Sequence, residues 1–310
     1  MSKIARSLLL VWLPLAITAI LATLAITLGQ SLQQNVVASV KSSSAVTHKT
    51  VRVTTSVAVW ADIAAQVGGK LVTTTALVSK PGQDPHSYVA TARDQLAVNQ
   101  ADLTIANGNG YDSFFQTLTA ASIAKPSNSH LVIGCHLGCD GNPHVWYSLS
   151  QVAASVPKIA HRLATAAGNQ TPISQGREYQ KTLAELQART RDISAGALGK
   201  RYLLTESFAS YLLQDLKMND ATPTGFKTAV ENEQDASPLV MSQIHGLLSS
   251  HKVSLVITNR QTSNSQTLQI TDWAKAANVP VLRWSELLPP HTTYVEWMGA
   301  NLNQIEGILK

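Results

Sequence analysis

The chain has 310 residues, of which 45% are hydrophobic and 14% charged, and its formal net charge at pH 7 is +5. Roughly 260 residues follow an apolar N-terminal stretch, which is enough for two modest domains with cores of their own. The positive charge is spread along the chain without a dense Lys/Arg cluster, so nucleic acid is excluded as an expected partner.

An apolar run comes first in the chain. Lys3 and Arg6 precede residues 8–28, which carry no charge. A run of this length can cross a bilayer as a helix and is longer than the apolar core of a usual signal peptide. The positive-inside rule places the short N-terminus in the cytoplasm and the rest of the chain outside. We expect residues 1–29 to form a membrane anchor, or else a signal segment cleaved near Ala38.

Residues 30–50 contain no acidic residue and are rich in Ser, Val and Gln. This composition predicts a flexible linker between the membrane and the exported part. The first cysteine of the chain is Cys135, so a lipid-modified cysteine directly after the apolar run is not expected. The protein is therefore predicted to be tethered by a helix, or secreted after cleavage, and not to be a lipoprotein.

Strand-like and helix-like stretches alternate in the next part of the chain. Residues 59–67 have helical spacing and stop at Gly68 and Gly69. Short stretches rich in Val, Thr and other apolar residues are expected to be strands: 51–57, 71–78, 101–106 and 130–134. This alternation favours a mostly parallel sheet covered by helices, an N-terminal α/β lobe that we assign to residues 51–170.

A long helix is predicted for residues 171–198. It begins at Thr171 and Pro172, a cap followed by a favourable first-turn proline. Its apolar stripe consists of Tyr179, Leu183, Leu186, Thr190 and Ile193. A second alternating pattern follows, with strands expected at 201–205, 254–258 and 279–284. The fold class is therefore α/β, with residues 199–310 as a second, C-terminal lobe.

Two short turns each place a histidine directly after a proline. His86 follows Pro85, and His144 follows Pro143. Proline restricts its own φ and biases the preceding residue toward extended geometry, so each histidine is carried on a stiff turn. A pre-positioned imidazole loses little entropy on binding, which suggests one metal site assembled from distant segments. The spacing alone also allows two unrelated surface turns.

The two turns, taken in this order, resemble a known family. The segments DPHSY at 84–88 and NPHVW at 142–146 are similar to motifs of the metal-binding receptors of bacterial ABC importers, the zinc and manganese cluster of solute-binding proteins. The resemblance runs over residues 50–310. It implies that one long bridging helix joins the two lobes, that the metal binds in the cleft between them, and that His86 and His144 are ligands.

The resemblance implies a third ligand at Glu206, directly after the strand expected at 201–205. Zinc-type members usually have histidine at this position, and manganese-type members have glutamate. The local match departs from the family pattern in one respect. The family's phenylalanine three residues after the ligand corresponds to Ala209 here, and Phe208 stands one position early.

A fourth ligand is expected after the strand at 279–284, which makes Glu286 the candidate and Glu296 its rival. The position of Glu206 and Glu286 after predicted strands supports the assignment independently, because ligands in open α/β sheets bind at strand ends. A solvated surface carboxylate is the alternative interpretation of each glutamate.

Other residues are expected to surround the site or stabilise the lobe. Tyr88 and Trp146 flank the ligand turns and are expected to pack the cleft and exclude water. Asn107 belongs to an Asn-Gly turn that resembles one lining the cleft in the family, and is expected to support the ligands. Cys135 and Cys139 are predicted to form a short-loop disulfide, as is common in exported proteins, with a second metal site as the alternative.

The proposed ligands supply imidazole nitrogen and hard carboxylate oxygen but no thiolate, which suits Mn²⁺, Zn²⁺ or Fe²⁺ and disfavours Cu(I). A glutamate in place of a third imidazole favours Mn²⁺, whereas the general affinity order favours Zn²⁺. The resemblance implies a monomeric, non-catalytic receptor that binds Mn²⁺ or Zn²⁺ outside the membrane and delivers it to an ABC permease. Two alternatives are an exported metallohydrolase, although no HExxH-type pair is present, and a surface adhesin.

Overall fold

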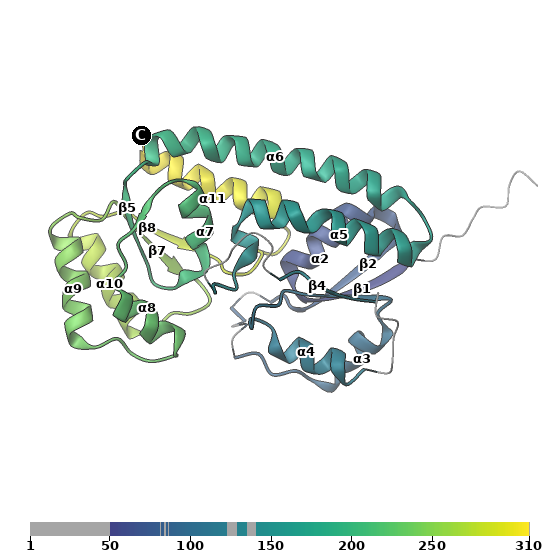
Figure 1. The fold of residues 1–310 in the computed structure, drawn as a ribbon. Helices are drawn as coiled ribbons and strands as arrows, with labels where there is room; N and C mark the ends of the chain where they lie inside the picture. The colour runs from purple at the N-terminus through teal and green to yellow at the C-terminus, as the bar shows by residue number, and fades with distance from the viewer. Residues whose placement is uncertain are drawn as a thin grey trace, which may run out of the picture. The chain divides into compact units, whose positions relative to one another are not determined.

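Two parallel β-sheets and one long helix between them organise the chain (Figure 1). The computed structural model describes residues 50–309 except 81, 84, 86, 123–128 and 135–140. Residues 48–310 form one compact unit. In the part that is described, no helix is both long and apolar enough to cross a membrane, and the span predicted at 8–28 lies outside that part.

The first sheet has the strand order β2-β1-β3-β4, with every neighbouring pair parallel. Its strands are β1 (Val51–Val57), β2 (Val72–Val78), β3 (Leu103–Ala106) and β4 (His130–Val132). Figure 1 shows helices on both faces of this sheet: α2 (Ala58–Gly68) and α5 (Leu149–Ala167) on one, α3 (Ala92–Gln100) and α4 (Ser113–Ala120) on the other. Burial on both faces explains why β1 and β3 are buried at every position except Arg52.

The second sheet repeats this topology with the order β6-β5-β7-β8, again entirely parallel. Its strands are β5 (Arg201–Leu204), β6 (Asn219–Asp220), β7 (Leu255–Asn259) and β8 (Val281–Trp284). The helices of this lobe are α7 (Ser210–Asp215), α8 (Thr224–Glu231), α9 (Pro238–Ser249) and α10 (Ser265–Ala276). In such an order the chain leaves β5 toward one edge of the sheet and reaches β7 on its other side, which opens a crevice at the carboxyl ends of these two strands.

Helix α6 (Thr171–Ala197) passes from one lobe to the other as a continuous element (Figure 1). The predicted stripe is buried at Leu183, Leu186, Thr190 and Ile193. The last helix, α11 (Tyr294–Leu309), packs against both α6 and α2. The backbone N–H of Tyr294 donates to Asp62 Oδ2 on α2 at 2.8 Å. The last helix therefore contacts the first lobe, which the assignment of residues 199–310 to the second lobe did not anticipate.

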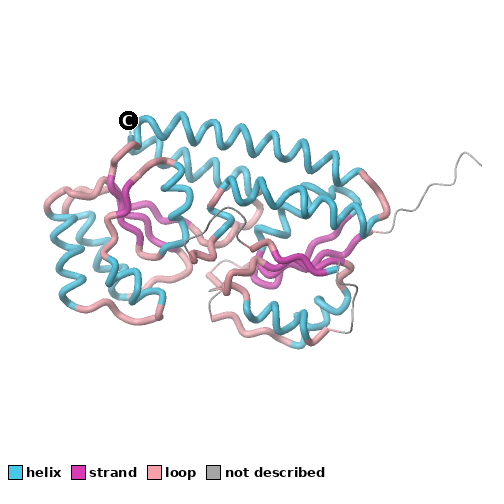
Figure 2. Tube along the Cα trace, in the orientation of Figure 1, coloured by secondary structure: helices cyan, strands magenta, loops and turns pink. Residues whose placement is uncertain are grey.

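The fold class predicted from the sequence is confirmed, and the differences lie at element ends. The strand expected at 279–284 begins at Val281, because Pro280 has no N–H to donate to the sheet. The strand expected at 101–106 begins at Leu103, although the Asp102 N–H still donates to the Arg52 carbonyl at 2.8 Å and its side chain accepts from the Arg52 N–H at 2.9 Å. Figure 2 shows loops and short helical turns where the two lobes face each other.

Candidate metal site between the lobes

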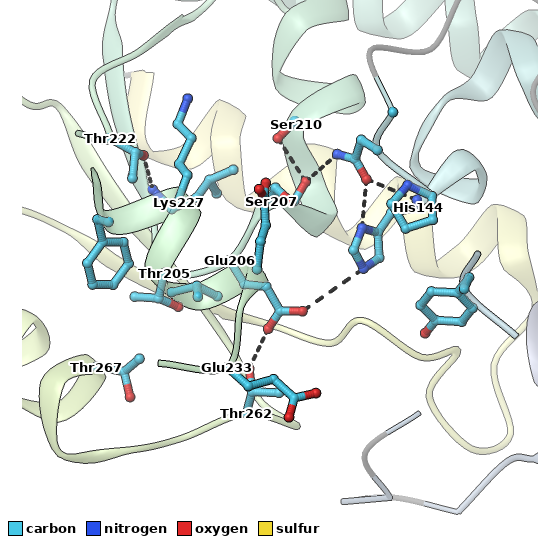
Figure 3. Close-up of a pocket in the computed structure, with 18 of the residues that line it drawn as sticks. His144, Thr205, Glu206, Ser207, Ser210, Thr222, Lys227, Glu233, Thr262 and Thr267 are labelled. Carbon is cyan, nitrogen blue, oxygen red and sulfur yellow. Dashed lines mark hydrogen bonds and ion pairs between the residues drawn. The ribbon is translucent and has the colours of Figure 1, made fainter. Parts of the chain in front are cut away.

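A cavity of about 930 Å³ is lined by residues of both lobes. The first lobe contributes Tyr111 and His144 to the lining, and the second contributes Glu206, Ser207 and Thr262. In Figure 3 the side chains of His144 and Glu206 point toward each other across this cavity, with Thr262 on the far side of the glutamate. Two of the predicted ligands, His144 and Glu206, therefore line this cavity.

The strand order of the second lobe brings polar side chains to one sheet edge. Glu206 stands two residues after β5, Glu286 stands two residues after β8, and Asn259 is the last residue of β7, which lies between these strands. All these strands are parallel, so their carboxyl ends meet at the same edge. His144 reaches this edge from the other lobe, directly before the short helical turn Val145–Tyr147.

His144, Glu206 and Glu286 form a cluster in which one ligand atom from each residue lies within 4.8 Å of the others. His144 Nε2 lies 3.1 Å from Glu286 Oε1 and 4.0 Å from Glu206 Oε1. His144 is 3% exposed and Glu286 is fully buried, so neither group is a solvated surface side chain. Two carboxylates this close together, one of them fully buried, need a nearby positive charge, which a bound metal ion can supply.

Asn142 fixes the orientation of the imidazole. Its Oδ1 accepts hydrogen bonds from the His144 backbone N–H at 3.0 Å and from His144 Nδ1 at 2.7 Å, while its Nδ2 donates to the Ser207 carbonyl at 2.8 Å. Since Nδ1 carries the proton in this arrangement, Nε2 is the nitrogen suited to bind a metal ion. Asn107 supports the same turn, because its Nδ2 donates to the Pro143 carbonyl at 2.9 Å.

Buried donors hold the two carboxylates. Tyr111 donates to Glu286 Oε1 at 2.6 Å, and Asn259 Nδ2 donates to Glu206 Oε2 at 2.7 Å and to Glu286 Oε2 at 2.8 Å. The Thr262 hydroxyl also donates to Glu206 Oε2. Burial raises the pKa of the Tyr111 hydroxyl well above its ordinary value, and the charge of Glu286 raises it further, so Tyr111 remains a donor at neutral pH.

Aromatic side chains pack beside the cluster and link the two lobes. The ring of Trp146 lies 5.3 Å from that of His144, and its Nε1 donates to the Glu286 carbonyl at 3.0 Å. Tyr147 donates to the Ser285 carbonyl at 2.6 Å. These bonds join the histidine turn of one lobe to the strand end of the other, so the ligand groups of the two lobes are positioned together.

The remaining predicted residues are either outside the described part of the chain or apart from the cluster. His86, Cys135 and Cys139 lie outside the described residues. Tyr88 packs against Phe114 and donates to Asp94 at the start of α3. Within the part of the chain that the structure describes, these interactions do not involve His144.

Glu286, rather than Glu296, lies beside His144. Glu296 is exposed, and its carboxylate accepts hydrogen bonds from the backbone and hydroxyl of Thr293 in the first turn of α11. It is a helix-capping residue. Hydrogen bonds also lower the pKa of the Glu296 carboxyl below its ordinary value.

Sequence reasoning missed four residues that orient the cluster: Tyr111, Asn142, Asn259 and Thr262. Asn142 could have been found, because it belongs to the NPHVW motif itself. The other three depend on which strands are neighbours in the second sheet and on how the lobes face each other.

Comparison with known proteins identifies the family. The profile of the family described as "Zinc-uptake complex component A periplasmic" (ZnuA) matches residues 53–307. The chain is 24% identical over 274 residues to the iron-binding protein YfeA of Yersinia pestis, covering 84% of this chain and 86% of that protein. It is 23% identical over 284 residues to the manganese-binding lipoprotein MntA of Bacillus subtilis (strain 168), covering 84% and 90%.

Solved structures agree with the fold. The structure of the Cd-bound periplasmic metal-binding protein from Candidatus Liberibacter asiaticus superimposes with a TM-score of 0.67 at 20% identity, over 84% of this chain and all of that one. The family profile covers most of the chain, from the first strand to the last helix. The chain therefore belongs to the ZnuA family of periplasmic zinc-uptake components.

Proposed function

We propose that this protein is an extracytoplasmic receptor that binds a divalent transition metal ion between its lobes and delivers it to an ABC permease. The observation that carries the proposal is the convergence of buried His144 Nε2 and buried Glu286 with the partly buried carboxylate of Glu206. Imidazole and carboxylate ligands suit Mn²⁺, Zn²⁺ and Fe²⁺. Relatives that are named for iron and manganese binding support the same class of cargo.

The remaining ligand and the mode of attachment belong to the same proposal. His86 stands in the motif that the sequence predicts as a ligand turn, and Ser87 beside it lines the cavity. We assign His86 as the ligand that completes the set with His144, Glu206 and Glu286. The N-terminal apolar segment would keep the receptor, as a monomer, near the permease.

A receptor of this kind needs no catalytic group. Catalytic metal sites keep a coordination position for an activated water, whereas a site that holds cargo surrounds the ion with protein ligands. The donors around His144 and Glu286 position the ligands and do not bind a substrate. The metal ion is the cargo, and release to the permease completes the cycle.

Metal titration of the purified full-length chain tests the proposal. After removal of metal, added Mn²⁺ or Zn²⁺ should raise the thermal unfolding midpoint in a saturable way. At a metal concentration of a hundred times the dissociation constant, the unfolding free energy should increase by about 2.7 kcal/mol. His144→Ala should abolish the shift. His161→Ala, on the exposed face of α5, is the matched control and should keep it. A wild-type protein that shows no shift with any divalent ion would contradict the proposal.

A further inference from the structure

The side-chain amide of Asn259 lies between the two carboxylates of the site. Its Nδ2 donates to Glu206 Oε2 at 2.7 Å and to Glu286 Oε2 at 2.8 Å, so one NH₂ group bridges both glutamates. Its Oδ1 accepts from the Gln261 backbone N–H at 3.0 Å, which determines which way the amide faces. Asn259 is 3% exposed, and its bonds are therefore shielded from water.

The backbone of Asn259 is held as firmly as its side chain. It ends β7, whose neighbours β5 and β8 lead to Glu206 and Glu286. The Asn259 N–H donates to Thr205 Oγ1 at 3.3 Å, and the next residue, Arg260, donates to the Trp284 carbonyl at 2.9 Å. The amide is thus carried on a fixed strand end and imposes its geometry on both carboxylates.

This geometry gives the two oxygens of each glutamate different environments. The Oε2 atoms face the Asn259 amide, and the Oε1 atoms are those that lie toward His144 Nε2. Glu286 Oε1 also accepts from the Tyr111 hydroxyl at 2.6 Å. The Thr262 hydroxyl reinforces the difference at Glu206 by donating to the same Oε2. Glu206 Oε2 accepts from both Asn259 and Thr262, so a Glu206 that bound one ion through both oxygens would lose a hydrogen bond. At Glu286 the bond from Asn259 orients the carboxylate with Oε1 toward His144.

We propose that Asn259 is a positioning residue that, together with Thr262, holds Glu206 to binding a metal ion through one oxygen and favours the same mode at Glu286, and thereby selects an ion of low coordination number. Zn²⁺ is satisfied by four ligands in a tetrahedral arrangement, whereas Mn²⁺ favours a larger, mostly oxygen shell. The Asn259 bridge thus favours Zn²⁺ over Mn²⁺, and it opposes the preference for the harder ion that Glu206 brings. This inference rests on the proposed function.

A merely structural role of Asn259 makes different predictions. If the amide only separated two buried negative charges, its removal would weaken all divalent ions alike and leave the geometry of the bound ion unchanged. If the amide selects the ion, its removal changes the ratio of Zn²⁺ to Mn²⁺ affinity and the coordination number of the bound ion. The visible absorption of Co²⁺ reports the second quantity, because four-coordinate Co²⁺ absorbs far more strongly than six-coordinate Co²⁺.

The experiment compares full-length wild type, Asn259→Ala and Thr262→Val after removal of metal. Wild type should give the intense Co²⁺ spectrum of a four-coordinate ion. In Asn259→Ala this spectrum should weaken, and the ratio of Zn²⁺ to Mn²⁺ affinity should fall by about tenfold or more. Thr262→Val should move both readouts in the same direction by less. Asn232→Ala, an exposed asparagine at the end of α8, is the control and should match wild type.

A folded Asn259→Ala protein with an unchanged Co²⁺ spectrum and an unchanged affinity ratio overturns the inference. Thermal unfolding without metal establishes that the variant is folded. If Asn259→Ala is not folded, Thr262→Val is the deciding variant. An unchanged Co²⁺ spectrum and an unchanged affinity ratio in Thr262→Val would equally overturn the inference. Failure of wild type to bind any of these ions would instead contradict the proposed function.

Discussion

The hydroxyl of Tyr111 is the donor that links the first lobe to the buried carboxylate of Glu286, at 2.6 Å. Tyr111→Phe removes this donor and leaves Glu286 Oε1 short of a hydrogen bond inside the protein. We expect a loss of about 1–3 kcal/mol in the unfolding free energy of the metal-free protein. We also expect metal affinity to fall by about tenfold, as is typical when a group that orients a ligand is removed.

Thr54→Val is the control for this prediction, because it removes a buried hydroxyl of β1 that donates to the Ala97 carbonyl of α3. It should lower stability without changing metal affinity. Isothermal titration with Zn²⁺ and thermal unfolding separate the two effects. Equal metal affinities of Tyr111→Phe and wild type would contradict the role given to this hydroxyl.

Single residues show how far the sequence predicts the site. The family resemblance located Glu206 and Glu286, supported by the apolar strand before each, and it located His144 together with the stiffness of its turn. Asn259 also ends a strand, but its role depends on β7 lying between β5 and β8, and strand order is not written in the local pattern. Tyr111 belongs to the other lobe, so its bond to Glu286 follows only from the way the lobes face each other.

At the scale of elements, the N-terminal cap of helix α3 depends on the charge of the Asp94 carboxylate. Asp94 Oδ2 accepts hydrogen bonds from the backbone and hydroxyl of Thr91, each at 2.7 Å, and from Tyr88 at 2.8 Å. Burial alone would raise the pKa of Asp94, but the hydrogen bonds from Thr91 and Tyr88 outweigh it and lower this pKa below its ordinary value. The carboxylate therefore stabilises the folded state.

The sign of the pH dependence follows from this direction. Because the folded pKa of Asp94 is below its unfolded value of about 3.9, its contribution is present above that pH and is lost as pH falls through the folded pKa. Asp94→Asn should lower the unfolding free energy by about 1 kcal/mol at pH 7. The difference from wild type should shrink below about pH 4. Urea unfolding between neutral and acidic pH measures it, with Glu185→Gln on α6 as the control, and a difference independent of pH would contradict the prediction.

Element boundaries were less predictable than element types. Helix α6 differs from the expected range by a single residue, because Thr171 and Pro172 mark its start and the apolar stripe continues through its last turns. The strand that begins late at Val281 does so because Pro280 has no N–H to donate to the sheet. The packing of α11 against α2 has no local signal, because it depends on the bond from the Tyr294 backbone to Asp62 and on contacts between helices distant in the sequence.

At the scale of the whole molecule, the lobes share a hydrophobic core. One continuous cluster of buried residues contains Ile105 of the first sheet and Ile257 of the second, together with Trp146 and Trp284. A separate cluster, which includes Phe226, Ile244, Leu248 and Ile270, belongs to the second lobe alone. With α6 continuous between the lobes and a shared core, we expect the lobes to unfold together and metal binding to alter their relative position only slightly.

Ile244→Ala tests this cooperativity from within the second lobe's own cluster, where Ile244 is fully buried. Removing this side chain should cost about 2–5 kcal/mol. If the lobes are one cooperative unit, the cost lowers a single unfolding transition, and backbone amides of β1 in the first lobe lose hydrogen-exchange protection as much as those of β7 in the second. Phe115→Ala, in a cluster confined to the first lobe, should lower the same transition. Two separate calorimetric transitions, with exchange raised only in the mutated lobe, would show that the lobes fold independently, and α6 would then act as a linker rather than as part of a common core.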